Sequence, residues 1–328
     1  MTISDRVYGQ INITEPIILE LLASPVLERL RDIDQHGYTR AHWPKDKIIS
    51  RLEHSIGVYW LLKKYGAPLA EQVAGLIHDI SHSAFSHCID YILNEGNGQK
   101  QNHQDNIFPD FVRQSDIGSI LEKHGLDLEY LLDDNNFPLK EAPLPNLCAD
   151  RLDYSLRAAI VYGDLSKTAA NLLLNNLVIK DKAWVFKDLP SAKQYAELFK
   201  TLNDKYYTAL RAGAMHQVIG DYLGYALDKG YLEKADLYTT DQEILDKTAS
   251  FHQQDRKLLN LSKRLNIKDG FENNPNNYDR IIHLKSRLVD PLFFDQGEIH
   301  RFSDIETSWK KILKQELGYK TLYLKFKN

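Results

Sequence analysis

Apolar residues recur every three or four positions through most of the first 240 residues, the spacing that places them on one face of an α-helix. Pro25 is expected to divide the first such segment into two short helices, with Ser24 as the cap of the second. Thr240 and Glu243 form a capping-box pattern, which predicts a further helix. The segments with helical spacing are residues 15–34, 51–64, 68–80, 108–112, 117–124, 147–162 and 192–229.

The tail of the chain has a different pattern. Asparagines around Pro275 break helices, and residues 280–288 and 322–326 alternate in the way of β-strands. Residues 183–186 are a further short, aromatic candidate strand, and the polar stretch 94–106 is expected to be a loop. Strands therefore gather toward the C-terminus, after a long helical region.

The composition is that of an ordinary globular protein. The chain has 328 residues, 43% of them hydrophobic, and a net charge of −4. This length fits one large domain with an annex, so we expect a mainly α domain over residues 1–269 and a small α+β annex over residues 270–328. The balanced charge argues against a protein that coats nucleic acid through a basic field, so nucleic acid is not expected as a partner.

Cysteine content limits the kind of metal site that the chain could form, and hydropathy limits where the protein could be in the cell. Cys88 and Cys148 are the only cysteines, too few for a disulfide scaffold or a four-Cys zinc site. No run approaches the ~20 apolar residues of a membrane helix, and residues 1–10 lack a basic segment followed by an apolar stretch. We therefore expect a cytoplasmic protein that does not contact the membrane.

Histidine use is uneven along the chain. An isolated His-Asp doublet such as His78-Asp79 is more often a hydrogen-bonded core histidine than a metal ligand. Here His82 follows one helical turn later, and His54 lies in the preceding predicted helix. Imidazole and carboxylate together suit Mn, Fe, Co, Ni or Zn better than Ca, and the absence of nearby cysteine favours a catalytic metal site. Seven of the 12 histidines fall in one stretch: His36, His42, His54, His78, His82, His87 and His103.

A fourth ligand is best supplied by the sequence DRLDY at residues 150–154. On a helix, Asp150, Asp153 and Tyr154 fall on one face, so one turn could present both a metal-facing and a substrate-facing side chain. A surface pair of Asp150 with Arg151 would explain the same residues without a function.

Together these residues resemble the HD-domain superfamily of metal-dependent phosphohydrolases, whose name comes from the His-Asp doublet. The sequences RLEHSIGV at 51–58, HDISHSAFSH at 78–87 and DRLDY at 150–154 are similar to the branch that contains the deoxynucleoside triphosphate (dNTP) triphosphohydrolases. The resemblance covers residues 5–235 and implies an HD-domain helical core.

The resemblance also implies roles for individual residues. One divalent metal (Mn, Fe, Ni, Co, Zn or Mg) would be held by four ligands drawn from three helices. Its charge would help to hydrolyse phosphate esters or anhydrides of nucleotides or nucleotide-like molecules. The implied metal ligands are His54, His78, Asp79 and Asp150, with Asp150 also counted as catalytic. The implied proton-transfer residues are His82 and His103. The implied substrate contacts are Gln35, His36, Arg51, His87, Arg151 and Tyr154.

Three departures concern the sugar of a dNTP. In the triphosphohydrolase branch a leucine usually follows the Gln that reads deoxyribose, whereas here Gln35 is followed by His36. Ala158 stands in place of an acidic residue that binds the sugar hydroxyl, and Ala214-Met215 in place of a Tyr-Gln pair that frames the nucleotide. Each missing contact would leave a polar substrate group unpaired at about 1–3 kcal/mol. We therefore expect weak dNTP hydrolysis and a better substrate among other phosphate esters.

Two alternatives stay open at this point. The chain could be an HD-type phosphodiesterase, or a catalytically weak HD fold that senses nucleotides or serves as a scaffold. Retention of all four ligand positions and of His82 and His103 argues against the scaffold, which has no physical need of them. A homo-oligomer is also expected.

Overall fold

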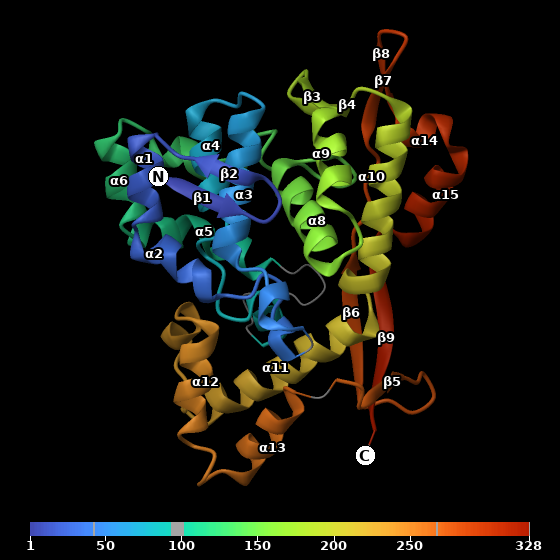
Figure 1. Cartoon of the computed structure of the whole chain (residues 1–328). Helices are drawn as coiled ribbons and strands as arrows, with labels where there is room; N and C mark the ends of the chain where they lie inside the picture. Colours follow the sequence, from blue (N-terminus) through green and yellow to red (C-terminus); the bar gives the residue numbers. More distant parts are fainter. Residues whose placement is uncertain (42, 93–101, 267, 328) are drawn as a thin grey trace.

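The computed structural model describes residues 1–41, 43–92, 102–266 and 268–327. It is mainly helical, with small sheets that gather toward the C-terminus (Figure 1), which confirms the expected fold class. The α-helices are α1 (Pro16–Leu22), α2 (Pro25–Glu28), α3 (Arg51–Lys64), α4 (Leu69–Ile77), α5 (His103–Gln114), α6 (Ile117–Lys123), α7 (Leu128–Leu132), α8 (Ala149–Tyr162), α9 (Lys167–Asn175), α10 (Leu189–Leu202), α11 (Leu210–Asp228), α12 (Asp241–Ala249), α13 (Arg256–Arg264), α14 (Phe302–Ile305) and α15 (Thr307–Glu316). The strands are β1 (Thr2–Asp5), β2 (Gly9–Asn12), β3 (Leu177–Lys180), β4 (Ala183–Phe186), β5 (Phe271–Asn273), β6 (Arg280–Ser286), β7 (Leu292–Asp295), β8 (Glu298–Arg301) and β9 (Gly318–Phe326).

Helix α3 is buried on nearly every side and packs between α4 and α8. Ser50 caps it, because the side chain of Ser50 accepts a hydrogen bond from the Glu53 amide at 3.2 Å. Its buried residues include Arg51 and His54 as well as apolar side chains. A central helix that buries charged and imidazole groups needs partners for them, and these partners make up the site described below.

Most of the predicted elements are present. The proline break at Pro25, the strands at β4, β6 and β9, and the capping box of Thr240 with Glu243 are all confirmed. Ser24 occupies the cap position of α2, but its hydroxyl donates to Asp116 at 2.7 Å instead of capping the helix.

The prediction of a loop over residues 94–106 is wrong for residues 103–106, which belong to α5. Residues 93–101 lie outside the described part of the chain. Helix α5 already begins at His103, because the carboxylate of Asp90 accepts a hydrogen bond from the His103 amide at 2.9 Å. The sequence pattern also missed the N-terminal β1–β2 hairpin and the strands β7 and β8, which are four residues long and carry little periodic signal.

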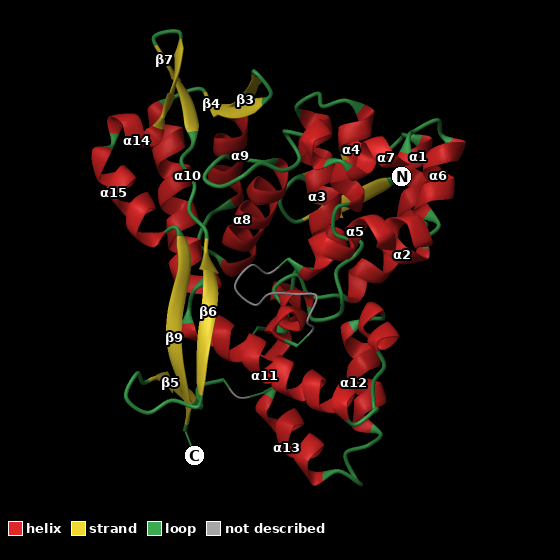
Figure 2. Cartoon of the chain, turned by 180° about the vertical axis from the view of Figure 1, so that it is seen from behind, coloured by secondary structure: helices red, strands yellow, loops and turns green. Residues whose placement is uncertain are grey.

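The C-terminal annex is joined to the helical region through a shared sheet. Strand β7 pairs in parallel with β4, so the sheet β3-β4-β7-β8 contains strands from both sides of the expected boundary, whereas β5-β9-β6 is formed by the tail alone (Figure 2). The annex also holds the segment before α8: the Asp290 amide donates to the Pro145 carbonyl at 2.9 Å, and Arg301 donates to Asn146 at 2.7 Å. The boundary at residue 269 stays a prediction.

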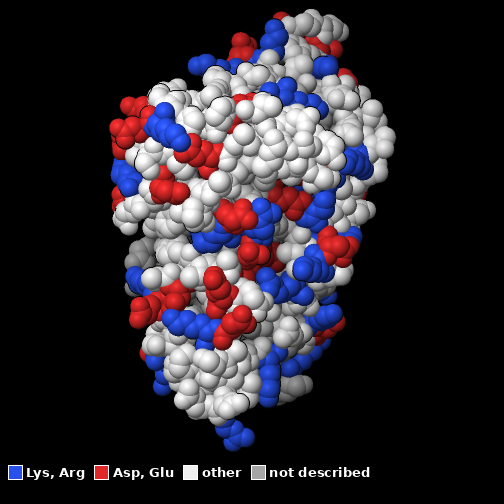
Figure 3. Space-filling view, turned by 60° about the vertical axis from the view of Figure 1, so that its left-hand side comes forward, with Lys and Arg blue, Asp and Glu red and all other residues white. Residues whose placement is uncertain are grey.

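In the described ranges no helix combines the length and the apolar character that crossing a membrane requires. On the face shown in Figure 3, basic and acidic side chains are interspersed.

Candidate active site

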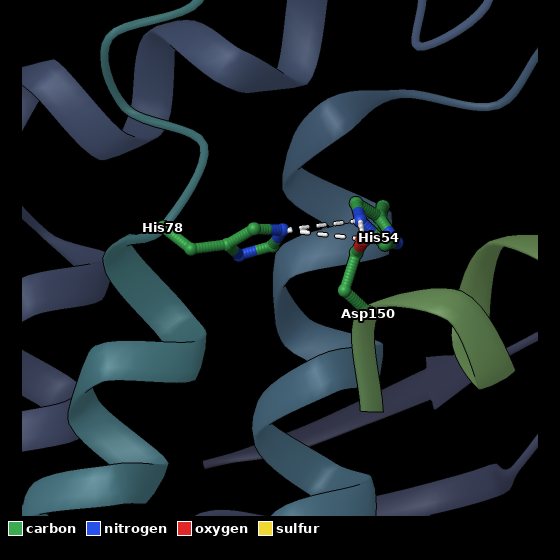
Figure 4. Close-up of side chains that lie close together, drawn as sticks. All are labelled: His54, His78 and Asp150. Carbon is green, nitrogen blue, oxygen red and sulfur yellow. Dashed lines mark hydrogen bonds and ion pairs between the residues drawn. The ribbon is translucent and has the colours of Figure 1, made fainter. Parts of the chain in front are cut away.

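Three side chains from three different helical segments converge at the centre of the molecule. His54 comes from α3, His78 from the C-terminal end of α4, and Asp150 from the first turn of α8 (Figure 4). His54 Nε2 lies 2.9 Å from Asp150 Oδ1 and 3.2 Å from His78 Nε2. One ligand atom from each of the three lies within 4.8 Å of the others.

Asp79 lies at the edge of this cluster. Its Oδ1 is 3.4 Å from His78 Nε2, and its Oδ2 is 3.9 Å from His54 Nε2. Arg51 Nη1 donates to Asp79 Oδ2 at 2.6 Å, and the Arg51 guanidinium also donates to Ser86 and to the Gln35 carbonyl. Burial raises the pKa of Asp79, but the charges of Arg51, His78 and His54 together outweigh it and lower that pKa, so the carboxyl stays ionised. Arg51 thus contacts the edge of the cluster.

The hydrogen bonds of the two histidines decide which nitrogen faces the cluster. His54 Nδ1 donates to Asp153 Oδ2 at 2.7 Å, and His78 Nδ1 donates to the Gly75 carbonyl at 2.8 Å. In a neutral imidazole the other nitrogen, Nε2, then carries a lone pair. Two lone pairs 3.2 Å apart beside an ionised carboxylate repel each other unless a cation lies among them. The donor set therefore fits a divalent metal, with second partners that fix each ring.

Without a metal, protons on the imidazoles would compensate the nearby carboxylates in its place. Burial lowers the pKa of His54, but the hydrogen bonds to Asp150 and Asp153 outweigh it and raise that pKa to about 9. Burial raises the pKa of Asp150, and the hydrogen bonds from His54 and His78 bring it well below its usual value. The carboxylates hold positive charge near the two imidazoles.

A buried ionic network supports His54 from behind. The Arg157 guanidinium binds both oxygens of Asp153, at 2.9 Å and 2.8 Å, and reaches Asp5 at 2.9 Å. Tyr8, in the turn of the N-terminal hairpin, donates to Asp153 at 2.8 Å. Asp153 and Arg157 are fully buried, so each charge depends on the other for compensation. The hairpin that sequence analysis missed thus helps to fix the ring of His54.

Gly57 makes room for this network. It lies on α3 one turn after His54, and a Cβ there would overlap the Asp153 carboxylate and the Arg157 guanidinium.

A chain of polar side chains leads away from the cluster of His54, His78 and Asp150. His82 Nε2 is 3.4 Å from Asp79 Oδ1, and the ring of His87 meets the ring of His82 edge-on at 5.0 Å. Asp90 holds His87, with 3.3 Å between Asp90 Oδ2 and His87 Nδ1, and caps α5 at His103. Burial and the charge of Arg51 lower the pKa of His82 well below its usual value, so its ring is neutral. Asp90 was not among the residues singled out from the sequence.

The contacts described for His103 place it farther along this chain. Its Nε2 lies 2.9 Å from the hydroxyl of Tyr238, and its ring is buried.

The loop that carries these histidines contains two consecutive non-glycine residues with left-handed backbone, Phe85 (φ 59°) and Ser86 (φ 49°). Such a conformation costs free energy and persists where surrounding contacts fix it. The Ser86 hydroxyl donates to the Asp34 carbonyl at 2.6 Å, and the Phe85 amide donates to Asp241 at 2.7 Å.

The carboxyl of Asp241 is expected to make folding stability depend on pH. Burial and the nearby carboxyl of Asp34 raise the pKa of Asp241 from 3.8 to about 7, although Arg40 Nη2 lies 3.6 Å away. Because the native state holds this proton more tightly than the unfolded state, stability falls as pH rises from 3.8 through 7, by at most about 4 kcal/mol. The asparagine in Asp241→Asn cannot ionise. As pH rises through this window, the variant should therefore gain stability relative to the wild type. Urea unfolding at pH 5, 6, 7 and 8 measures the difference, and a difference independent of pH would contradict the assignment.

The predicted substrate residues Gln35 and His36 lie beside an aromatic cluster. The His36 ring is parallel to Tyr207 at 6.3 Å, and its Nδ1 is 3.3 Å from the Tyr162 hydroxyl. Burial is the main reason that the pKa of His36 falls to about 3, so the ring is neutral. Among the described residues, Gln35 Oε1 and the Tyr207 hydroxyl are buried without a hydrogen-bond partner. Two unsatisfied polar atoms of this kind are typical of a binding pocket.

The departures at the sugar-binding positions involve core packing. Ala158 is buried against Ile49 and Val161, and Ala214 packs with β-strand residues of the annex. The sulfur of Met215 accepts a hydrogen bond from the Tyr38 amide at 3.3 Å. Ala158, Ala214 and Met215 therefore have only apolar atoms or a thioether where the related enzymes have polar side chains.

Tyr154 lies close to the histidine cluster, with its ring 6.5 Å from that of His54 and 5.8 Å from that of Tyr207. Arg151, in contrast, is engaged on the other side of α8. Its guanidinium donates to the carbonyl of Asn146 at 2.6 Å, to Glu141 at 3.2 Å and to the sulfur of Cys148 at 3.1 Å. Its predicted role as a phosphate contact stays a prediction, and it would require some of these bonds to be exchanged.

Glu141, Cys148 and Asp150 also have potential ligand atoms within 4.8 Å of one another. Because the Arg151 guanidinium contacts both Glu141 and Cys148, a cation already compensates this group.

The chain resembles known proteins in sequence and in fold. The HD domain family matches residues 51–158, the part of the chain that contains His54, His78 and Asp150. The metal-dependent phosphohydrolase cns2 of Cordyceps militaris is 31% identical over 90% of this chain and 86% of its own. The uncharacterized protein YdhJ of Bacillus subtilis is 33% identical over 95% of this chain and 94% of its own.

More distant proteins share parts of the sequence or the fold. The deoxynucleoside triphosphate triphosphohydrolase SAMHD1 homolog of Dictyostelium discoideum is 31% identical over 41% of this chain and 28% of its own length. A phosphohydrolase structure from Bacteroides thetaiotaomicron has a TM-score of 0.71 at 18% identity and covers 98% of this chain and 99% of that one, which is a likeness of fold. The match to the HD family and the similarity to cns2 over nearly the full length together place the chain in the HD-domain superfamily of metal-dependent phosphohydrolases, in a branch that also resembles the dNTP triphosphohydrolases.

Proposed function

We propose that this phosphohydrolase holds one divalent metal with His54, His78, Asp150 and Asp79, and that it hydrolyses phosphate esters of nucleotides or nucleotide-like molecules. The observation that carries the proposal is the approach of His54 Nε2 and His78 Nε2 to 3.2 Å, with both Nδ1 atoms committed as donors and Asp150 Oδ1 2.9 Å from His54. A bound divalent metal would neutralise phosphoryl oxygens and lower the pKa of water.

The protein residues would bind and orient the substrate. Arg51, fixed by Asp79 and Ser86, places a positive charge at the edge of the cluster, where it would attract a phosphate group. His87, oriented by Asp90 through Nδ1, would contact the same group through Nε2, as a donor once the charge of the phosphate favours protonation of the ring. Tyr154 would form the wall of the pocket beside His54.

We infer that the sugar or alcohol part of the substrate lies toward Gln35 and His36. The buried Gln35 Oε1 lacks a donor among the described residues, and a hydroxyl of the substrate would satisfy it. His36, neutral and able to hydrogen-bond, tolerates a polyol where an apolar side chain would exclude one. With Ala158 and Ala214 in apolar packing, few groups would bind the sugar of a dNTP.

Chromatographic product analysis of a substrate panel tests this function, because it detects phosphate, triphosphate, nucleosides and linear dinucleotides alike. The protein would be stripped of metal, reloaded with Mn, Mg, Ni or Co, and offered dGTP, GTP, nucleoside monophosphates, small phosphomonoesters and cyclic dinucleotides. We expect metal-dependent turnover and a kcat/KM for dGTP no higher than that for the best phosphomonoester, because two or three sugar contacts at about 1–3 kcal/mol each are missing. A hundredfold preference for dGTP would contradict the substrate assignment, and turnover confined to cyclic dinucleotides would favour the phosphodiesterase alternative.

We propose His82 as the proton-transfer residue, because its Nε2 lies 3.4 Å from Asp79 Oδ1, next to the proposed metal site. His103, next to Tyr238, is the alternative. His82→Asn should lower turnover by about 10²–10⁴ with metal content unchanged. His124→Asn is the matched control, since His124 pairs with Glu20 outside the site at 2.8 Å. Near-normal turnover in both His82→Asn and His103→Asn would remove this assignment.

The cytoplasmic location, the homo-oligomer and the lack of a nucleic-acid partner stay predictions. Metal content and turnover together distinguish the scaffold alternative from the enzyme. A protein that binds no divalent metal and hydrolyses none of these substrates would have to act by another mechanism.

A further inference from the structure

One edge of the proposed pocket follows helix α8. Tyr154 lies next to His54, and Tyr162, the last residue of α8, reaches His36. The two tyrosines are eight residues apart, which is about 12 Å along the helix axis. The ring of Tyr207 contacts both ends, since it is 5.8 Å from that of Tyr154 and 6.3 Å from that of His36. His36 therefore belongs to the part of the pocket that lies away from the proposed metal ligands, where the alcohol part of a substrate would be.

Aromatic contacts fix the ring of His36. Its plane is nearly parallel to that of Tyr207, with 12° between them, and its Nδ1 is 3.3 Å from the Tyr162 hydroxyl. Tyr162 is held in turn by Trp43, whose ring stacks on it at 5.0 Å, and by the ring of Tyr206 at 4.8 Å. The protein thus orients the ring of His36 without the help of a substrate.

The protonation states of the two groups decide the direction of the hydrogen bond between Tyr162 and His36. Burial, with smaller contributions from the charges of Arg51 and His54, lowers the pKa of His36 to about 3, so the ring is neutral. Burial raises the pKa of the Tyr162 hydroxyl, which therefore keeps its proton. A phenol is a stronger donor than a neutral imidazole, and an imidazole nitrogen is a better acceptor than a phenol oxygen. Tyr162 therefore donates to His36 Nδ1, and the proton of the imidazole is on Nε2.

The Nε2–H group of His36 lies on the edge of the ring away from Tyr162. Within the described ranges it has no hydrogen-bond partner, and the ring is only partly buried. The charges of Arg51, His54 and His87 act on this ring, which places it beside the site. An N–H group can donate but cannot accept. A hydroxyl oxygen of the substrate would therefore satisfy it, whereas the C–H group of a deoxy analogue would leave it unpaired.

We propose that Tyr162 positions His36 as a hydrogen-bond donor toward the substrate, and that this pair selects substrates with a free hydroxyl on the sugar or polyol part over their deoxy analogues. The inference rests on the proposed function, in which the alcohol part of the substrate lies toward Gln35 and His36, and it narrows the substrate to ribose-type or other hydroxyl-bearing phosphate esters. A hydroxyl also donates, as the buried Gln35 Oε1 requires. Tyr162 is a positioning residue, because it acts on the substrate through His36.

Matched pairs of substrates test the selection. The best hydroxyl-bearing substrate of the panel is compared with its deoxy analogue, and GMP with 2′-deoxy-GMP and 3′-deoxy-GMP, by kcat/KM and by calorimetric affinity for the metal-loaded protein. For the wild type we expect a preference of about 10- to 100-fold for the hydroxyl-bearing member. His36→Leu should abolish the preference, and Tyr162→Phe should reduce it several-fold while the values for the deoxy member stay unchanged. Tyr206→Phe is the matched control and should match the wild type, since the hydroxyl of Tyr206 donates to Asp164 at 2.6 Å.

Nuclear magnetic resonance of isotope-labelled histidine rings gives a readout that does not depend on turnover. His36→Leu identifies the resonances of His36, which we expect to show the form protonated on Nε2. Tyr162→Phe should shift them toward a mixture of the two neutral forms, and Tyr206→Phe should leave them unchanged. A wild-type ring protonated on Nδ1 would overturn the proposal, as would equal kcat/KM and equal affinity for the two members of every pair. Absence of metal-dependent hydrolysis by the wild type is a different result, since it would reject the proposed function itself and leave the protonation of His36 as expected.

Discussion

Asp150→Asn is expected to lose bound metal and phosphohydrolase turnover together, with turnover reduced at least about 10³-fold. Asp150 Oδ1 is 2.9 Å from His54 Nε2 and 3.5 Å from His78 Nε2, so its charge sits where both imidazoles point. An asparagine keeps the size of the side chain but removes the negative charge that balances a divalent cation. Metal content after dialysis and phosphate release, measured on the same preparation, give the two readouts.

The control for this variant is Asp110→Asn on α5, whose carboxylate is 79% exposed and pairs with Arg113 on the surface. It should keep both metal and turnover. Thermal unfolding of the metal-free proteins shows whether Asp150→Asn is folded, and we expect a midpoint close to that of the wild type. Loss of turnover with full metal content would assign Asp150 a role in substrate binding, and retention of both would exclude it as a ligand.

Most helices could be predicted from local sequence, because the apolar spacing and the capping residues of each helix lie within its own segment. Residues 240–243 illustrate this, since the capping box of Thr240 with Glu243 forms in the structure. The strands β7 and β8 and the β1–β2 hairpin could not be predicted in this way, because each is four residues long and is defined by its pairing partner. The order of His54, His78, Asp79 and Asp150 along the chain led to the proposed metal site, since each has a distinctive motif around it.

Contacts between distant segments were beyond such reasoning. The sequence places Asp153 and Arg157 one helical turn apart, yet nothing in it shows that His54 lies against Asp153. Arg151 had the motif of a substrate contact, but its charge is shared with Glu141 and backbone carbonyls that no local pattern reveals.

The second large effect is expected from Gly57→Ala, which adds one methyl group behind His54. Within a helix such a change alone would favour folding by about 1 kcal/mol. At Gly57 the new Cβ would overlap the Asp153 carboxylate and the Arg157 guanidinium, and neither can move without losing a buried partner. We therefore expect a loss of about 2–4 kcal/mol in unfolding free energy.

Metal affinity should fall in the same variant by about 10- to 100-fold, because Asp153 orients the ring of His54 through Nδ1. Asp153→Asn, which leaves the backbone unchanged, should reproduce the loss of affinity. Gly224→Ala in α11 is the matched control, since its Cβ would meet Ile92 at an ordinary 3.5 Å and should leave metal affinity unchanged. Urea unfolding and metal titration of the three variants separate packing from orientation. Wild-type metal affinity in Asp153→Asn would show that the ring of His54 is fixed by the protein around it without this carboxylate.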